Sequence, residues 1–489
     1  MLRISIQFNR QDYEYDVYTL VSAFYPGSRI KTWLQGEKPQ GEDFDVFYRV
    51  EYGDGQITFS RDQSGECDFD VCRIEESDDR GAVKNKLKRL IYRFLSRETG
   101  KDLPWGDLTG IRPVKIAMGK LEEGWKNVDI ARYMRETYFT SPEKTALAIA
   151  TANREKDILK DLDVEKGYSL YVGVPFCPSI CLYCSFGSHP LERWKHMVEP
   201  YLQALFRELD FIAGEMKDRP LHSIYIGGGT PTTLEPDQLR RLLDRICRNF
   251  DLSQLREFTV EAGRPDTITE AKLAVLRAYP VDRISINPQT MNQKTLDLIG
   301  RRHTVEETEA AFSLARTLGF SNINMDLIVG LPGEGQAEVE ATLQAVQKLD
   351  PDSLTVHSLA LKRATRLHLF KDQYKEISFE NSQEIMQMTQ RYAALMGMGP
   401  YYLYRQKNIA GNFENVGYSK EGKAGIYNIL IMEEKQTILA AGPGASTKFV
   451  FSHGSRIERV ENVKDLKNYV ERIDEMLERK RKGIELYGA

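Results

Sequence analysis

The chain between residues 169 and 361 repeats one pattern, a short apolar run followed by a longer amphipathic segment. Short apolar runs bounded by turn residues are typical of buried strands, and apolar residues three or four positions apart are typical of helices. Strands that alternate with helices favour a parallel sheet. Six strands are predicted, at Ser169–Val174, Ser223–Ile226, Glu257–Glu261, Arg283–Asn287, Asn322–Val329 and Ser353–Leu359.

Six strand–helix units predict an α/β fold, a partial (β/α)6 barrel like a TIM barrel, over residues 161–365. In such barrels the functional side chains lie at the C-terminal ends of the strands. Polar residues that follow the strands are therefore the first candidates for a site. The connecting helices are expected at Glu199–Lys217, Pro236–Asn249, Thr304–Leu318 and Gln336–Leu349.

Two other regions flank the predicted barrel. Residues 1–160 begin with alternating strands joined by the turn Gly53–Gly55 and continue as helices, which predicts an N-terminal α+β accessory domain. Residues 366–489 predict a C-terminal α+β domain that covers the barrel mouth. Its elements are expected to be helices at Phe379–Met398 and Val463–Lys482 and strands at Ala424–Met432 and Thr437–Ala441.

The first barrel strand leads into Cys177, Cys181 and Cys184, in a C-x3-C-x2-C spacing. Cysteine thiolates hold iron–sulfur clusters, and a 4Fe–4S cluster takes four ligands. Three cysteines leave one iron open, and an open metal position is where a cofactor or substrate binds. Iron–sulfur clusters and S-adenosylmethionine (SAM) both carry radical chemistry. The spacing therefore favours a cluster whose open iron binds SAM.

Two other interpretations of these cysteines remain open at this point. His189 could complete a Cys3His zinc site, or the thiols could hold no metal. Neither interpretation explains the motifs further along the chain, whereas a cluster that binds SAM does.

Several polar motifs follow the predicted strands. Gly227–Thr230 carries three glycines, which let a ligand approach the backbone, so bare N–H and C=O groups there could bind the amino-acid end of SAM. Glu261 ends the third strand and could accept hydrogen bonds from an ammonium group or a ribose. Gln289 follows the fourth strand. Asp326 lies within an apolar strand, where a charge is costly unless it is paired or functional.

Composition restricts the class of protein. A chain of 489 residues is too long for one ordinary hydrophobic core. Its content of 41% hydrophobic and 28% charged residues is typical of globular proteins. A net charge of -4 argues against a nucleic-acid surface, and no apolar run has the length of a membrane span. Six cysteines without a secretion signal predict a cytoplasmic protein, and we expect a monomer.

These motifs occur in the order and approximate spacing of a known family. They resemble the oxygen-independent coproporphyrinogen III oxidases (coproporphyrinogen dehydrogenases), which are radical-SAM enzymes with the partial barrel predicted above. The resemblance covers residues 169–445, and the long N-terminal region is most similar to the HemZ-type branch. The matching positions are Tyr171, the three cysteines, Gly227–Thr232, Glu261, Gln289, Arg301 and Asp326–Pro332.

The resemblance implies a role for each matching residue. The three cysteines would hold the 4Fe–4S cluster, and Tyr171, Gly228 and Glu261 would contact the SAM bound to it. A second SAM would lie among Tyr183, Gly229, Thr230, Gln289, Arg301, Asp326 and Ala360.

The resemblance also implies the reaction. A low-potential electron donor would drive cleavage of SAM to a radical, which would start the loss of two propionate carboxyl groups from coproporphyrinogen III and give protoporphyrinogen IX. Because this tetrapyrrole carries carboxylates, basic residues should bind it. The candidates are Lys362, Arg363, Arg366, Arg405 and Lys407.

The chain departs from the family at two places, and two other functions remain open. Some members have another cysteine two residues after Cys184, where this chain reads Ser185-Phe186, and Lys448 lies near where an aliphatic residue is expected. Relatives of the HemW type carry haem instead of decarboxylating a substrate. A radical-SAM methyl transfer with ring opening of haem is a third alternative.

Overall fold

The computed structural model describes residues 2–37, 43–63, 66–110, 112–185, 187–360, 381–406, 413–451 and 454–487. The chain forms two compact units. The first is Met1–Ala150 with Gly411–Phe413, and the second is Thr151–Ala410 with Glu414–Ala489. In the described part of the chain, no helix combines the length and the apolar character that a bilayer crossing requires.

The first unit contains a five-stranded sheet in the order β2-β1-β3-β4-β5. Strands β3 and β4 form the predicted hairpin. The strands are β1 (Arg3–Phe8), β2 (Arg29–Leu34), β3 (Val46–Gly53), β4 (Gln56–Gln63) and β5 (Glu66–Arg73), and the helices are α1 (Glu14–Phe24), α2 (Arg80–Thr99), α3 (Val114–Glu122) and α4 (Asn127–Tyr138). Helix α5 (Pro142–Leu159) begins in the first unit and ends in the second.

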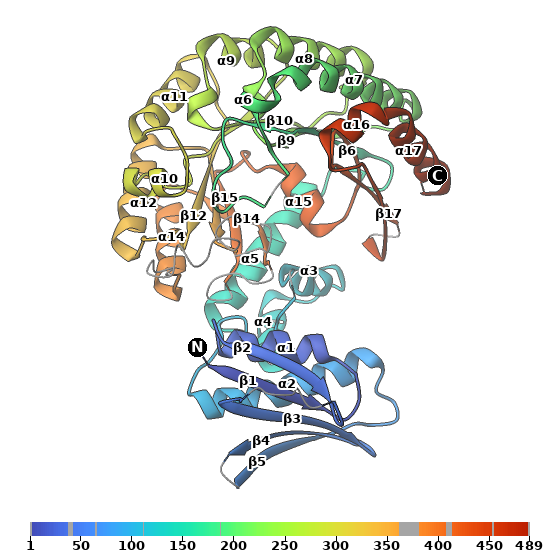
Figure 1. Cartoon of the computed structure of the whole chain (residues 1–489), viewed down its shortest axis with the longest axis vertical. Coiled ribbons are helices and arrows are strands. Elements are labelled where there is room, and N and C mark those ends of the chain that lie inside the picture. The colour runs from blue at the N-terminus through green and yellow to red at the C-terminus, as the bar shows by residue number, and fades with distance from the viewer. Residues whose placement is uncertain are drawn as a thin grey trace. The chain divides into compact units, whose positions relative to one another are not determined.

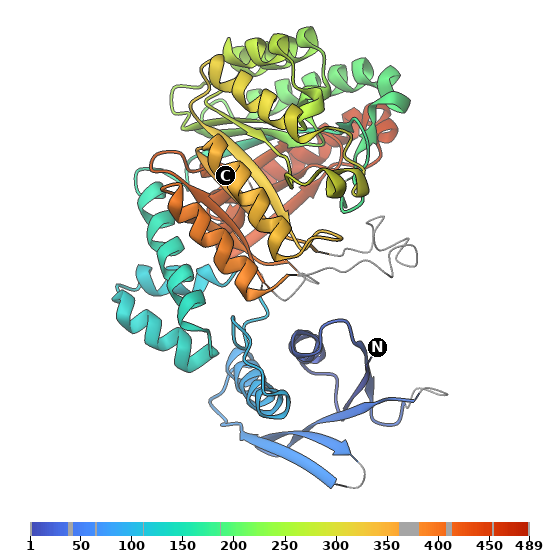
Figure 2. The same ribbon diagram turned by 90° about the vertical axis from the view of Figure 1, so that its left-hand side faces the viewer.

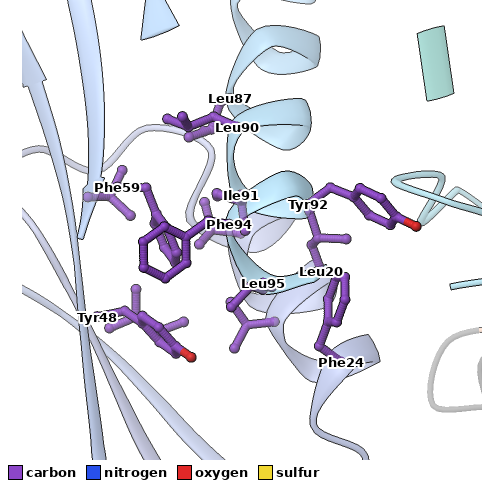
Figure 3. Packing of buried hydrophobic residues seen from close by; sticks show 14 of the residues in the cluster. Leu20, Phe24, Tyr48, Phe59, Leu87, Leu90, Ile91, Tyr92, Phe94 and Leu95 are labelled. Carbon is purple, nitrogen blue, oxygen red and sulfur yellow. The ribbon is translucent and has the colours of Figure 1, made fainter. Parts of the chain in front are cut away.

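Helix α2 carries the core of this unit. The Asp79 side chain caps its N-terminus by accepting from the Ala82 N–H, and Gly100 ends it in the left-handed region. Its buried side is aliphatic and aromatic, and Phe94 meets the rings of Tyr48 and Phe59 edge-on (Figure 3). Burial of several large apolar side chains stabilises this packing by about 2 kcal/mol for each.

The second unit contains the predicted partial barrel, and the six parallel strands lie side by side in chain order. Both faces of these strands are mostly buried, because helices cover the outer face in an arc (Figure 1). The strands are β6 (Tyr168–Val174), β9 (Leu221–Gly228), β10 (Glu257–Gly263), β11 (Arg283–Ile286), β12 (Ile323–Val329) and β13 (Ser353–Ser358). The helices are α6 (Leu191–Trp194), α7 (Val198–Glu215), α8 (Pro236–Asn249), α9 (Glu270–Arg277), α10 (Gln293–Leu298), α11 (Val305–Thr317) and α12 (Gln336–Leu349).

The segment that we predicted as a separate C-terminal domain continues this sheet at both edges. Strand β15 pairs antiparallel with β13, and β16 pairs parallel with β6, so the segment belongs to the same compact unit. Helix α14 packs beside α12 (Figure 2). Its elements are α14 (Gln383–Leu395), β14 (Gly399–Tyr404), β15 (Asn415–Ser419), α15 (Ile426–Glu433), β16 (Thr437–Ala441), β17 (Ser446–Phe451), β18 (Arg456–Glu461), α16 (Leu466–Glu471) and α17 (Ile473–Tyr487).

One predicted strand is wrong. The run Ala424–Met432 was expected to be extended, but it forms α15 from Ile426 onward. The run is apolar on all sides because the helix is buried, and such a run cannot be told from a buried strand by its pattern. The strand expected at Thr437–Ala441 is confirmed as β16.

Candidate active site

A cavity of about 660 Å3 lies among the ends of the parallel strands in the second unit. Every residue predicted for the cluster or for SAM lines this cavity, although these residues come from six strands and their loops. Their roles stay predictions, but the fold brings them together. They are Tyr171, Cys177, Cys181, Tyr183, Cys184, Gly228, Gly229, Thr230, Glu261, Gln289, Arg301, Asp326 and Ala360.

The cysteine loop is fixed to the turn that follows α10. The Leu182 N–H donates to the Ile299 carbonyl at 3.0 Å, and the Ser179 hydroxyl donates to the Gly300 carbonyl at 3.1 Å. Leu182 and Ile299 also share a small apolar cluster with Leu331. Contacts within the protein therefore hold the loop in place.

Hydrogen-bond donors surround the thiols. The Thr230 hydroxyl lies 3.6 Å from Cys177 Sγ, and the guanidinium groups of Arg264 and Arg301 lie 4.0 and 3.9 Å from Cys181 Sγ. Burial raises the pKa of the Cys177 thiol. Two buried guanidinium groups suit an anionic iron–sulfur cluster, whose potential depends on charge and on hydrogen bonds to sulfur. The residues present therefore fit the cluster.

The zinc interpretation gains no support. His189 does not line the cavity, and its ring packs edge-on against Trp194 with the centroids 4.6 Å apart.

The glycine motif has a different explanation from the one expected. The N–H groups of Gly229 and Thr230 are not bare, because they donate to the carbonyls of Val174 and Phe176 at 2.7 Å each. A Cβ atom at Gly229 would lie 2.4 Å from the Phe176 carbonyl, so the close approach of two loops requires glycine there. Gly228 has a φ of 103° and lines the cavity.

Glu261 is a buried carboxyl group in the wall of the cavity. The Tyr225 hydroxyl donates to its Oε1. Burial raises the pKa of Glu261 to about 7, the Tyr225 hydrogen bond opposes this rise, and the nearby Asp326 adds to it. A ligand cation such as an ammonium group would favour the ionised form.

Asp326 is held by its neighbours in an ionised state. The Asn324 amide donates to its Oδ1 at 2.7 Å, and His357 Nε2 lies 3.8 Å from its Oδ2. Burial alone would raise the pKa of Asp326, but His357 and Asn324 hold it below its usual value, with a smaller contribution from Arg283.

Gln289 is strained and has an unused acceptor. Its φ of 70° lies in the left-handed region, which is uncommon for a residue other than glycine. Its backbone is fixed on both sides, since its N–H donates to the Asp326 carbonyl and its carbonyl accepts from the Ile328 N–H. Its side-chain oxygen is buried without a partner among the described residues. Strain of this kind is common at ligand sites, and Gln289 is part of the cavity lining.

Arg301 is only 4% exposed, although arginines that follow a helix are usually solvated. Its guanidinium donates to the Tyr183 hydroxyl at 3.0 Å and to the Asn287 carbonyl. It therefore connects the cysteine loop to the end of β11.

The sequence interpretation missed a stack of tyrosines in the cavity wall. The rings of Tyr225 and Tyr427 are stacked with centroids 4.6 Å apart, and Tyr171 lies 6.3 Å from both. Tyr171 and Tyr225 are direct neighbours in the β6–β9 register, which could have been inferred from the pattern. Tyr427 could not, because it lies on the helix that was expected to be a strand. Arg264, Arg283, His357 and Tyr404 were missed as well.

Most of the basic residues predicted to bind the substrate do not line the cavity or are not described. Lys362, Lys407, Arg363 and Arg366 lie outside the described residues. Arg405 is 4% exposed and does not line the cavity, and burial lowers its pKa to about 10, so its role in binding substrate stays a prediction. Lys448 does line the cavity, and its Nζ lies 3.7 Å from Glu434.

A buried ion pair fixes the loop after β16 at the cavity rim. The Gly442 N–H donates to Glu208 at 2.9 Å, and Lys480 lies 3.2 Å from the same carboxylate; both side chains are fully buried. Tyr469 also donates to Glu208. A Cβ atom at Gly442 would lie 2.4 Å from the Gly173 carbonyl, so this loop packs directly on β6.

Comparisons with known proteins agree with this site. Residues 171–346 match the Radical SAM superfamily. The oxygen-independent coproporphyrinogen-III oxidase-like protein HemZ of Bacillus subtilis is 41% identical over 92% of this chain and 91% of its own length. The heme chaperone HemW of the same organism is 37% identical over 41% of this chain and 55% of its length. The solved coproporphyrinogen III oxidase (HemN) of Escherichia coli, a Radical SAM enzyme, is 26% identical, with a TM-score of 0.50 over 66% of this chain and 73% of that one.

The partial barrel with its three-cysteine loop therefore defines a radical-SAM protein. Superfamily membership implies a 4Fe–4S cluster and SAM. Within the superfamily, the chain belongs to the HemZ family of oxygen-independent coproporphyrinogen-III oxidase-like proteins.

Proposed function

We propose that this chain is an enzyme that removes two propionate carboxyl groups from coproporphyrinogen III by oxidative decarboxylation, which gives protoporphyrinogen IX. One observation carries the proposal: a single cavity holds the three-thiol loop together with buried polar groups from several strands. The names of the HemZ and HemN relatives support coproporphyrinogen as the substrate class.

The residues of the cavity would divide the work. Cys177, Cys181 and Cys184 would hold the 4Fe–4S cluster. That cluster and SAM, when bound, supply the carbon radical that starts the reaction. Arg264 and Arg301, which lie near Cys181, would compensate the negative charge of the thiolates.

The remaining cavity residues would orient SAM. Tyr171, Gly228 and Glu261 would contact the SAM at the cluster, with Glu261 accepting from its ammonium group. A second SAM would lie among the other predicted residues, where Gln289 offers its unpaired oxygen and Asp326 its ionised carboxylate. The tyrosine stack would keep water from one wall of the cavity. A low-potential electron donor would be needed, and we propose that the chain acts as a monomer in the cytoplasm.

A second function, haem carriage without catalysis, is favoured by the similarity to HemW. The presence of Gln289, Arg301 and Asp326 in the cavity lining argues for an enzyme, since a carrier has no evident need for a second SAM pocket. Methyl transfer to haem with ring opening would use the same residues and is a third candidate.

An anaerobic turnover assay tests the proposal. The reconstituted protein would receive reductant, SAM and either coproporphyrinogen III or haem, and mass spectrometry would follow the products. We expect stepwise loss of two carboxyl groups together with formation of 5′-deoxyadenosine. Unchanged coproporphyrinogen with bound haem and no SAM consumption would move the chain to the carrier class, and methylated or opened haem would move it to haem breakdown.

A further inference from the structure

A second cavity, of about 470 Å3, lies in the first unit beside the edge strand β5 and helix α2. The proposed function makes no use of it. Its lining consists of Asp70, Val71, Cys72, Arg73, Lys86, Arg89, Leu90 and Arg93. Four of these eight side chains are cations and one is an anion, which is an unusual concentration of positive charge in a protein whose net charge is -4.

Neighbouring carboxylates neutralise little of this charge. Asp70 is already bound by Arg97, a residue outside the cavity, at 2.9 Å. Lys86 is paired with Asp78 at 2.6 Å. Across the ranges that the structure describes, none of the arginines in the cavity has a carboxylate partner within ion-pair distance. The lining therefore keeps about three positive charges for a ligand to neutralise.

The three cations of α2 are arranged by the helix itself. Lys86, Arg89 and Arg93 follow the i, i+3, i+7 spacing, so they share one face. The other side of the helix is fixed in the core by residues such as Ile91 and Phe94 (Figure 3). The cations therefore project from a rigid element.

Local contacts hold two guanidinium groups in place without occupying their terminal N–H groups. Arg89 Nε donates to the Asn85 carbonyl at 3.3 Å, and the Arg93 guanidinium lies 5.3 Å from the centre of the Phe139 ring. Both contacts leave the terminal N–H groups available for oxyanions. A preorganised guanidinium loses less side-chain entropy on binding than a free surface arginine.

Two acidic groups near these arginines offset little of the positive charge at neutral pH. Burial raises the pKa of the Cys72 thiol, which therefore stays protonated near neutral pH. Asp107 also acts electrostatically on Arg89, but burial raises the pKa of Asp107 to about 7, so this carboxyl group is only partly ionised at neutral pH.

We propose that this cavity binds a small polyanion that carries two or more carboxylates or phosphates. Several arginines around one hollow favour a multiply charged ligand, because each planar guanidinium fork can bind one carboxylate or phosphate in a bidentate manner. A porphyrin with its propionates and a diphosphate compound share this chemistry. The site is separate from the SAM cavity, and the proposal does not depend on the proposed reaction.

Binding to the full-length protein tests the site with two probes, coproporphyrin III as the carboxylate and inorganic pyrophosphate as the phosphate. Isothermal titration would measure the affinity and the number of equivalents bound. The variants Arg89→Gln and Arg93→Gln should each weaken binding of at least one probe about tenfold or more, because each removes charged hydrogen bonds. The matched control Lys84→Gln, on the same helix but outside the cavity, should change the affinity less than about twofold.

The outcomes separate the possibilities. If the cavity variants lose affinity for coproporphyrin III alone, the site binds carboxylates. If they lose affinity for pyrophosphate alone, the site binds phosphates. Because the barrel cavity could bind porphyrin too, the double variant Arg89→Gln with Arg93→Gln should lose one bound equivalent of coproporphyrin III and retain the other. If neither probe binds in the millimolar range, or if Lys84→Gln weakens binding as much as the cavity variants do, the proposal is wrong. Should the Gln variants misfold, Arg89→Lys and Arg93→Lys keep the charge and test the bidentate contact.

Discussion

In the second unit, Arg264, Arg283 and Arg301 are buried at exposures of 3%, 1% and 4%, at the strands and turns that form the cavity. In the first unit, none of the described arginines is buried, although Lys88, Asp107 and Lys144 are, and the main core cluster is aliphatic and aromatic. Burying a charge costs several kcal/mol unless partners offset it, so a fold retains such residues where a site needs them. The second unit is therefore built around buried polar groups at its cavity, whereas the first unit is built mainly around apolar packing.

The largest expected effect concerns the three thiols of the C-x3-C-x2-C loop, which line the cavity of the second unit. Cys184→Ala should remove one cluster ligand and abolish bound iron–sulfur absorbance and turnover. Cys247→Ala is the matched control, because Cys247 is on α8 and does not line the cavity. Full iron content and activity in Cys184→Ala would exclude the cluster assignment.

The next largest effect is expected on the stability of the first unit, which we attribute to apolar packing. Phe94 is fully buried between Tyr48 and Phe59, so Phe94→Ala should cost about 3–5 kcal/mol. Calorimetry should show a lower melting temperature for one transition. SAM affinity, measured by titration, should stay unchanged. A parallel fall in SAM affinity would show that the two units are not separate in function.

A smaller effect is expected at the buried carboxyl group of the cavity. Because the pKa of Glu261 is about 7, its ionised form increases as the pH rises from 6 to 8, and SAM affinity should rise with it. Glu261→Gln should weaken SAM binding about tenfold at pH 8 and flatten this pH dependence. Binding that is independent of pH in the unchanged protein would contradict the role given to Glu261.

The smallest effect is expected on stability, at Asp107, a buried carboxyl group of the first unit that can be compared with Glu261. Burial raises the pKa of Asp107 to about 7 as well, from an ordinary value of 3.8. A raised carboxyl pKa lowers stability as the pH rises through the interval between the two values. Asp107→Asn should therefore stabilise the protein by about 2 kcal/mol above pH 7 and by little below pH 4. SAM affinity should not change, in contrast to Glu261→Gln.

A denaturant titration at both pH values checks the Asp107 prediction. If Asp107→Asn destabilises the protein at pH 8, the carboxyl group makes a contact that its neutral amide cannot replace.

The barrel could be predicted from the sequence because its strands are uniform apolar runs of the right length, such as Ser169–Val174 within β6. The cavity could be predicted too, because parallel strands align their C-terminal ends and so bring Glu261 and Asp326 together. Both inferences depend only on local pattern and on topology.

The rest depends on contacts between distant segments. Tyr427 reaches the cavity from a helix whose sequence resembles a strand, and Arg283 is buried because charges on other elements surround it. The N–H groups of Gly229 and Thr230 are used by the neighbouring loop, which no pattern within the glycine motif reveals. These features require the packed structure.

The pairing of β16 with β6 has a consequence for biosynthesis. Strand β6 precedes the cysteines, whereas β16 and the cavity residues Gly444 and Lys448 are made more than two hundred residues later. During translation the cysteine loop therefore emerges with one side of its pocket missing. Metal loaded at that stage would be open to oxygen and to competing thiols, so the order of events should be complete synthesis first, then closure of the sheet edge, and delivery of iron and sulfide last.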